Sequence, residues 1–147
     1  MGVDLSKFPE MNTFSSVIRY SLCLEEAIEW FYKEASGKSK DLAGEFSALA
    51  ETHNKRYKLL EETRQQKLNE MILEPISGLD RDKYLPEVDP IKESAIVQQA
   101  IGVEEKAGVF YEELSKTANE LSREAAKVYK RMAKENDKLK AKLEKLK

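Results

Sequence analysis

The sequence predicts a single all-α domain, an antiparallel four-helix bundle built from two similar helix pairs. Of its 147 residues, 41% are hydrophobic and 35% are charged, with only 6 Gly and 4 Pro. This composition favours helices over sheets. Apolar residues also recur at steps of three and four along four long segments, which is the spacing of one buried helix face. A chain of this length can bury a sizeable core within one domain.

The first helix pair is expected at about residues 12–36 and 39–70. Gly37 is a plausible stop for the first helix, and Ser39 a plausible cap for the second. The inward positions of the first helix are Val17, Tyr20, Leu24, Ala27, Ile28, Phe31 and Tyr32. Those of the second are Leu42, Phe46, Leu49, Ala50, His53, Tyr57 and Leu60.

The second helix pair is expected at about residues 91–118 and 119–146, after a long crossover at 71–90. The crossover contains Pro75, Gly78, Pro86 and Pro90, which break the helical pattern. Pro90 would suit the first turn of the third helix. A connection of this length usually runs from one end of a domain to the other or carries function.

The two pairs are related by an internal repeat. The segment 24–36 aligns with 103–115, and six of the thirteen positions are identical, including a Glu-Glu pair and a Phe-Tyr pair at the same spacing. The partner helices match more weakly, at 46–50 against 129–133. Such a duplication predicts a pseudo-symmetric bundle whose centre is lined equally by both halves.

The repeated pattern resembles the rubrerythrin branch of the ferritin-like superfamily over nearly the whole chain. The resemblance implies a ferritin-like four-helix bundle with one long crossover between the second and third helices. In that family, the first and third helices each give one Glu, and the second and fourth each give a Glu-x-x-His motif. These residues hold two iron ions, which react with oxygen or peroxide.

Only half of this ligand set is matched here. Glu25 and Glu104 stand at the positions of the first- and third-helix ligands, each seven residues before a tyrosine. Both Glu-x-x-His motifs are degenerate, because the four family positions hold other residues: His53, Arg56, Asn136 and Leu139. A slip of one turn in the fourth helix would instead bring Glu135 or Asp137 inward.

Two functional interpretations remain open from these residues. In the first, Arg56 neutralises Glu25 and Glu104 in place of iron, no cofactor is needed, and the chain is a non-catalytic binding or structural bundle. In the second, Glu25, His53 and Glu104 hold one iron or other divalent ion, with Asn136 adding a carbonyl oxygen. The chain would then be a rubrerythrin-type oxidoreductase or a metal-handling protein. It would need a separate electron donor, because it lacks the four cysteines of a rubredoxin domain.

The composition indicates which classes of partner and which cellular location to expect. The 25 basic and 27 acidic residues nearly cancel, and no nucleic-acid-binding motif is present. No apolar run is long enough to span a membrane, and the lone Cys23 is expected to be a small core residue. We therefore expect a cytoplasmic protein that binds neither nucleic acid nor membrane. The resemblance and the length of the second helix imply a homodimer that forms through the second helix and the crossover. The lysine-rich segment 134–147 is interpreted as a solvated helix face.

Overall fold

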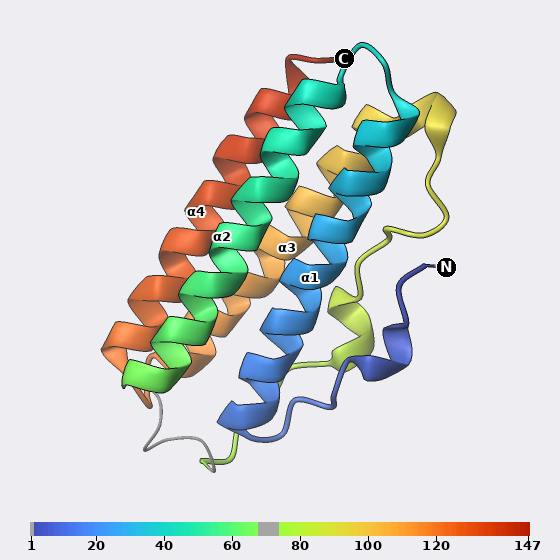
Figure 1. Cartoon of the computed structure of the whole chain (residues 1–147). Coiled ribbons are helices and arrows are strands. Elements are labelled where there is room, and N and C mark those ends of the chain that lie inside the picture. Colours follow the sequence, from blue (N-terminus) through green and yellow to red (C-terminus); the bar gives the residue numbers. More distant parts are fainter. Residues whose placement is uncertain (1, 68–73) are drawn as a thin grey trace.

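Four long helices dominate the computed structural model, which describes residues 2–67 and 74–147 (Figure 1). They are α1 (Phe14–Lys38), α2 (Ala43–Lys67), α3 (Ile96–Ala118) and α4 (Arg123–Glu144). Within the described residues, short 3-10 helices lie before α1, as η1 (Leu5–Lys7), and between α2 and α3, as η3 (Arg81–Tyr84) and η4 (Glu93–Ala95). The predicted all-α class and the four helices are confirmed.

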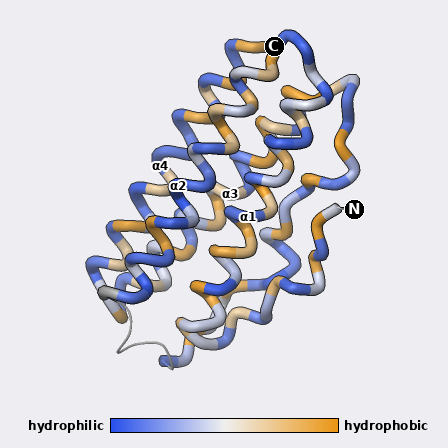
Figure 2. Tube along the Cα trace, viewed as in Figure 1, coloured by the Kyte–Doolittle hydropathy of each residue, from blue (hydrophilic) through white to orange (hydrophobic). Residues whose placement is uncertain are grey.

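The helices pack in the two pairs that the sequence repeat predicts. α1 packs mainly against α2, and α3 mainly against α4. Apolar and polar residues alternate along each helix (Figure 2), so one side of each helix can face the shared core. The largest fully buried side chains are aromatic: Tyr20, Tyr32, Tyr84, Tyr111, Tyr129, Phe14, Phe31, Phe46 and Phe110.

The boundaries between the first two helices differ from the prediction. α1 begins after Thr13, whose hydroxyl accepts from the backbone N–H of Ser16 while the Ser16 hydroxyl accepts in return from the backbone N–H of Thr13. α1 then runs through Gly37, which does not adopt the positive φ that makes glycine a helix stop. Ser39 is the C-cap of α1 rather than the start of the second helix, and α2 begins at Ala43. The predicted residues 68–70 of that helix, and 71–73 of the crossover, lie outside the described residues.

The third helix begins at Ile96 rather than at 91, and Pro90 precedes it. The cause is the side chain of Gln99, which satisfies backbone groups of the incoming segment. Its amide nitrogen donates to the carbonyls of Glu87 and Pro90 at 3.1 and 3.0 Å, and its oxygen accepts from the N–H of Lys92 at 2.8 Å. These bonds hold residues 87–92 in a non-helical path.

The fourth helix likewise begins later than predicted, at Arg123 rather than 119. The backbone N–H groups of Leu121 and Ser122 both donate to the carbonyl of Ala118, at 2.9 and 2.8 Å, and form a turn at the end of α3. The Ser122 hydroxyl then accepts from the N–H of Ala125 at 3.1 Å as the N-cap of α4.

The described part of the crossover lies along the side of the bundle formed by α1 and α3, next to the N-terminal segment (Figure 1). Arg81 of η3 links these parts. Its Nε donates to the carbonyl of Phe8 at 2.6 Å, and its own carbonyl accepts from the hydroxyl of Tyr20 at 2.6 Å. Tyr84 donates to the carboxylate of Glu113 on α3. This side of α1 and α3 is therefore covered by the chain's own connections.

Candidate functional site

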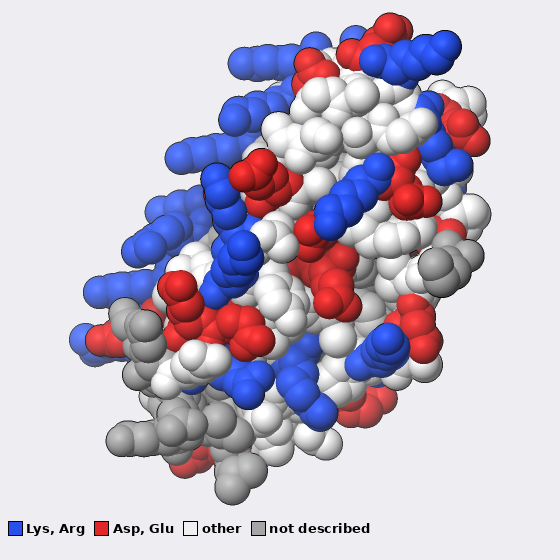
Figure 3. Space-filling view, in the orientation of Figure 1, with Lys and Arg blue, Asp and Glu red and all other residues white. Residues whose placement is uncertain are grey.

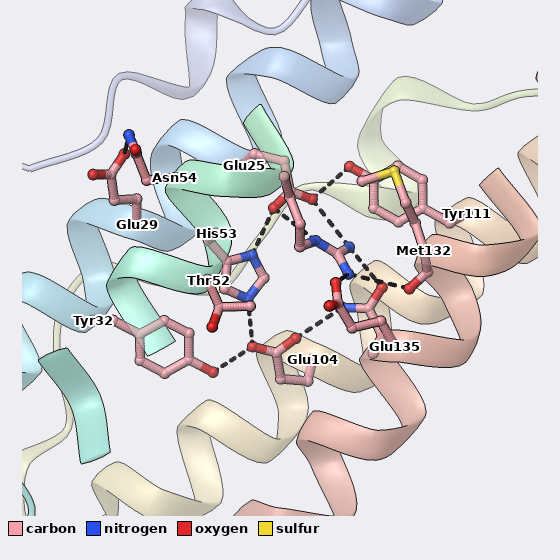
Figure 4. Close-up of polar contacts among 12 residues, drawn as sticks. Glu25, Glu29, Tyr32, Thr52, His53, Asn54, Glu104, Tyr111, Met132 and Glu135 are labelled. Atoms are coloured by element: carbon pink, nitrogen blue, oxygen red, sulfur yellow. Dashed lines mark hydrogen bonds and ion pairs between the residues drawn. The ribbon is translucent and has the colours of Figure 1, made fainter. Parts of the chain in front are cut away.

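A buried polar cluster lies where the four helices meet. Glu25 of α1 and Glu104 of α3 are both fully buried, and His53 of α2 lies between them (Figure 4). The His53 Nδ1 is 2.6 Å from Glu25 Oε1, and its Nε2 is 2.7 Å from Glu104 Oε2. The three residues that the sequence singled out as a candidate metal set are thus brought together, with the imidazole bridging the two carboxylates.

This geometry determines the charge of His53. A carboxylate oxygen only accepts hydrogen bonds, so each ring nitrogen must carry a proton to bond to its carboxylate. Burial by itself would lower the pKa of His53, but Glu104 and Glu25 outweigh it and raise the pKa to about 9. His53 is therefore an imidazolium at neutral pH.

Arg56, almost one turn further along α2, is the second buried cation. Its Nε and Nη2 donate to the two oxygens of Glu25, at 3.1 and 3.2 Å, and form a bidentate ion pair. Three further bonds satisfy the rest of the guanidinium: Nη1 to the carbonyl of Met132 at 3.1 Å, Nη1 to Glu135 Oε1 at 2.8 Å, and Nη2 to Asn136 Oδ1 at 2.9 Å. The predicted ion pair between Arg56 and Glu25 is confirmed. Arg56 makes no ion pair with Glu104, which bonds to His53 instead.

Two tyrosines bond reciprocally across the site. The Tyr32 hydroxyl of α1 donates to Glu104 Oε2 at 2.5 Å, and the Tyr111 hydroxyl of α3 donates to Glu25 Oε2 at 2.6 Å. Each tyrosine lies seven residues after the glutamate of its own helix, and it bonds to the glutamate of the other (Figure 4). The contacts therefore have the two-fold symmetry that the repeat predicts.

The same symmetry extends to α2 and α4. Phe46 of α2 stacks on Tyr32 with ring centroids 6.0 Å apart, and Tyr129 of α4 stacks on Tyr111 at 6.3 Å. Phe46 and Tyr129 are the first residues of the two weakly matching segments. The weaker part of the sequence repeat is thus matched by equivalent packing.

The register of α4 is the one predicted, without a slip. Asn136 is buried, and its Nδ2 donates to Glu104 Oε1 at 2.8 Å. Leu139 is also buried, and Asp137 is exposed. Glu135 lies at the rim with its side chain 46% exposed, and it reaches Arg56 from there.

The charges inside the bundle balance without an added ion. Two buried carboxylates face two buried cations, His53 and Arg56. Burial favours the neutral form of Glu25, but Arg56 and His53 dominate and lower its pKa to about 2. Against the same burial effect, His53 and Arg56 also lower the pKa of Glu104. Both carboxylates are therefore ionised across the physiological pH range.

These residues do not fit a metal ion as they are arranged. A metal needs a lone pair on the imidazole, and both ring nitrogens of His53 are occupied by protons donated to carboxylates. The Arg56 guanidinium offers only donors and repels a cation. Over residues 2–67 and 74–147, no group of three His, Cys, Asp or Glu side chains is placed to hold a metal.

Sequence reasoning missed part of this network. No bonds from Tyr32 and Tyr111 to the glutamates were expected, although the seven-residue spacing places each tyrosine and the glutamate before it on one helix face. The role of Glu135 was also missed, because a rim residue carries no burial signal. Cys23 lies apart from the network, half-buried rather than in the core, with Sγ 3.7 Å from the carbonyl of Lys7.

Comparison with protein-family models, with curated proteins and with solved structures gives no match for this chain. None of the described helices has the length and apolar character needed to cross a membrane. The site is therefore interpreted from its own residues: a closed, charge-balanced hydrogen-bond network at the centre of the bundle.

Proposed function

We propose that this chain is a rubrerythrin-like antiparallel four-helix bundle, with the ferritin-like crossover, in which an internal ion network replaces the di-iron site. It acts as a non-catalytic binding or structural bundle. The observation that carries the proposal is the imidazole of His53, which lies between Glu25 and Glu104 and bonds to both at 2.6 and 2.7 Å.

The physical reason is the cost of burying two carboxylates. An isolated carboxylate in an apolar interior is strongly disfavoured, so it must be protonated, paired with a cation or bound to a metal. Here His53 and Arg56 supply the two positive charges from within the chain. Asn136 donates to the one remaining oxygen, Glu104 Oε1. Tyr32 and Tyr111 each add a second bond to a carboxylate oxygen that already accepts from a cation. A metal would have to displace several bonds at once to enter.

The burial of the site also supports a non-catalytic role. Both glutamates and His53 are fully buried, and their polar atoms bond to one another. The hollows found over the described part of the chain are lined by other residues. The homodimer and the cytoplasmic location expected from the sequence stay predictions.

The test is metal content, measured by mass spectrometry on protein purified without chelator and then titrated with ferrous iron in air. We expect well under one metal per chain and no iron-oxo absorption, because the protonated imidazole of His53 and the guanidinium of Arg56 occupy the site. About two irons per chain would refute the proposal. A single tightly held ion that is lost in His53→Ala would favour the mononuclear alternative instead.

A further inference from the structure

Positive charge is concentrated on the last helix. Residues 123–147 contain ten Lys and Arg against four Asp and Glu, although the whole chain has 25 against 27. The basic residues form a ridge on the exposed side of α4, which we define as Arg123, Lys127, Arg131, Lys134, Lys138 and Lys142. Figure 3 shows Lys and Arg side chains projecting along this edge of the molecule.

At one end of this ridge the surface is hollowed. A hollow of about 440 Å³ lies between the end of α3 and the first turns of α4, and its lining is Ser115, Lys116, Asn119, Arg123, Ala126, Lys127 and Lys130. Four of these seven side chains are cationic, and no carboxylate is among the lining residues that the structure describes. The hollow is large enough for a small ligand with several charged groups.

Most of these cations are available to a ligand. Lys130 pairs with Glu112 of α3 at 3.0 Å. The other three, Lys116, Arg123 and Lys127, make no ion pair with any residue of the ranges 2–67 and 74–147. They come from both sides of the α3–α4 turn, so their charges converge on the hollow from two helices.

The local structure favours an anion there. Arg123 and Lys127 are four residues apart on one helix face, a like-charge arrangement that destabilises a helix unless an anion relieves it. The carbonyl of Ala118, at the end of α3, is already bonded to the N–H groups of Leu121 and Ser122.

We propose that this hollow binds a soluble small molecule carrying two or more phosphate groups, through Lys116, Arg123, Lys127 and Lys130. Clustered phosphates match several converging cations better than a single carboxylate does. The proposal is independent of the buried network, because none of the four residues contacts Glu25, His53, Arg56 or Glu104 in the described structure.

The experiment is calorimetric titration of the full chain with inorganic tripolyphosphate at physiological salt. We expect binding that weakens by about tenfold or more in Arg123→Gln/Lys127→Gln, because two charge-assisted contacts are lost. The matched control is Lys138→Gln/Lys142→Gln, which removes the same charge, four residues apart, from the same ridge. Lys138 lies about 16 Å along the helix from Lys127, beyond the screening length, so the control is expected to change affinity by less than about twofold.

Three results would overturn the proposal. The first is no measurable tripolyphosphate binding by the unmodified chain. The second is equal weakening in both double variants, which would mean that the ridge attracts anions without a defined site. The third is tight binding of duplex DNA or of phosphatidylserine vesicles, with a larger loss of that binding in the control Lys138→Gln/Lys142→Gln than in Arg123→Gln/Lys127→Gln. Circular dichroism of both variants checks that their helices are intact.

Discussion

Arg56→Met is expected to lower the free energy of unfolding by about 3–5 kcal/mol, the usual cost of removing one partner from a buried ion pair. Methionine fills a similar volume but leaves Glu25 with His53 as its only cation. The carbonyl oxygen of Met132 and the side-chain oxygen of Asn136 would also lose the hydrogen bonds that they accept from Arg56. Urea denaturation at pH 7 measures the change.

Lys55→Met is the matched control. Lys55 is the neighbour of Arg56 on α2, and its pair with Glu51 at 3.9 Å is solvent-exposed on both sides. The same substitution there should change stability by less than about 0.5 kcal/mol. If Arg56→Met lowers the free energy of unfolding by as little as the control does, Glu25 does not need its guanidinium partner.

A double variant separates lost charge from lost packing. Arg56→Met/Glu25→Gln removes one cation and one carboxylate together and leaves His53 paired with Glu104. If the penalty of Arg56→Met comes from an uncompensated buried charge, the double variant should be clearly more stable than the sum of the two single variants predicts. Additive costs would point to packing instead.

The second large effect is a gain of metal binding. The variant His53→Glu/Arg56→His/Asn136→Glu/Leu139→His places a Glu-x-x-His motif on α2 and another on α4, facing Glu25 and Glu104. We expect it to bind about two irons per chain, as the resemblance to the rubrerythrin branch implies. It should also be much less stable without metal, because it buries four carboxylates with no permanent cation. Iron content and the thermal midpoint with and without ferrous iron measure both effects.

A half-restored variant serves as the control. His53→Glu/Arg56→His alters α2 alone and keeps Asn136 and Leu139, so it should bind at most about one iron per chain. A helical four-substitution variant that binds no iron would show that these positions do not form a di-iron site, and the proposed ancestry would fall with it.

Much of the site could be predicted from the sequence because helix faces follow from periodicity. The repeat relates Glu25 to Glu104, and the resemblance to the rubrerythrin branch placed His53, Arg56 and Asn136 at inward-facing ligand positions. All of these are buried as predicted. A helix presents the same face every three or four residues, so these positions do not depend on the detailed packing.

The remaining features depend on the distances between helices, which the periodicity of the sequence does not predict. Tyr32 was expected to face inward, but the bonds of Tyr32 and Tyr111 to the opposite helix depend on how closely α1 and α3 approach. The bridging position of His53 depends in the same way on the separation of two helices. The start of α3 was misplaced because the Gln99 side chain bonds to the preceding segment, and Pro90 alone suggested a helix start.

The protonation of His53 links the network to pH. Its folded pKa, about 9, is above the ordinary value of 6.5, so its contribution to stability is complete below pH 6.5 and is lost as the pH rises through about 9. Glu25 behaves oppositely. Its pKa falls from 4.5 to about 2, so its contribution is complete above pH 4.5 and is lost as the pH falls toward 2.

The central claim, that a doubly protonated His53 replaces a metal between the two glutamates, is tested most directly by ¹⁵N NMR of the imidazole. His53 is the single histidine of the chain, so its signals need no assignment. We expect both ring nitrogens to be protonated at pH 7.5, with titration only near pH 9. A histidine with one unprotonated nitrogen at pH 7.5, titrating near 6.5 or bound to a metal, would contradict the account.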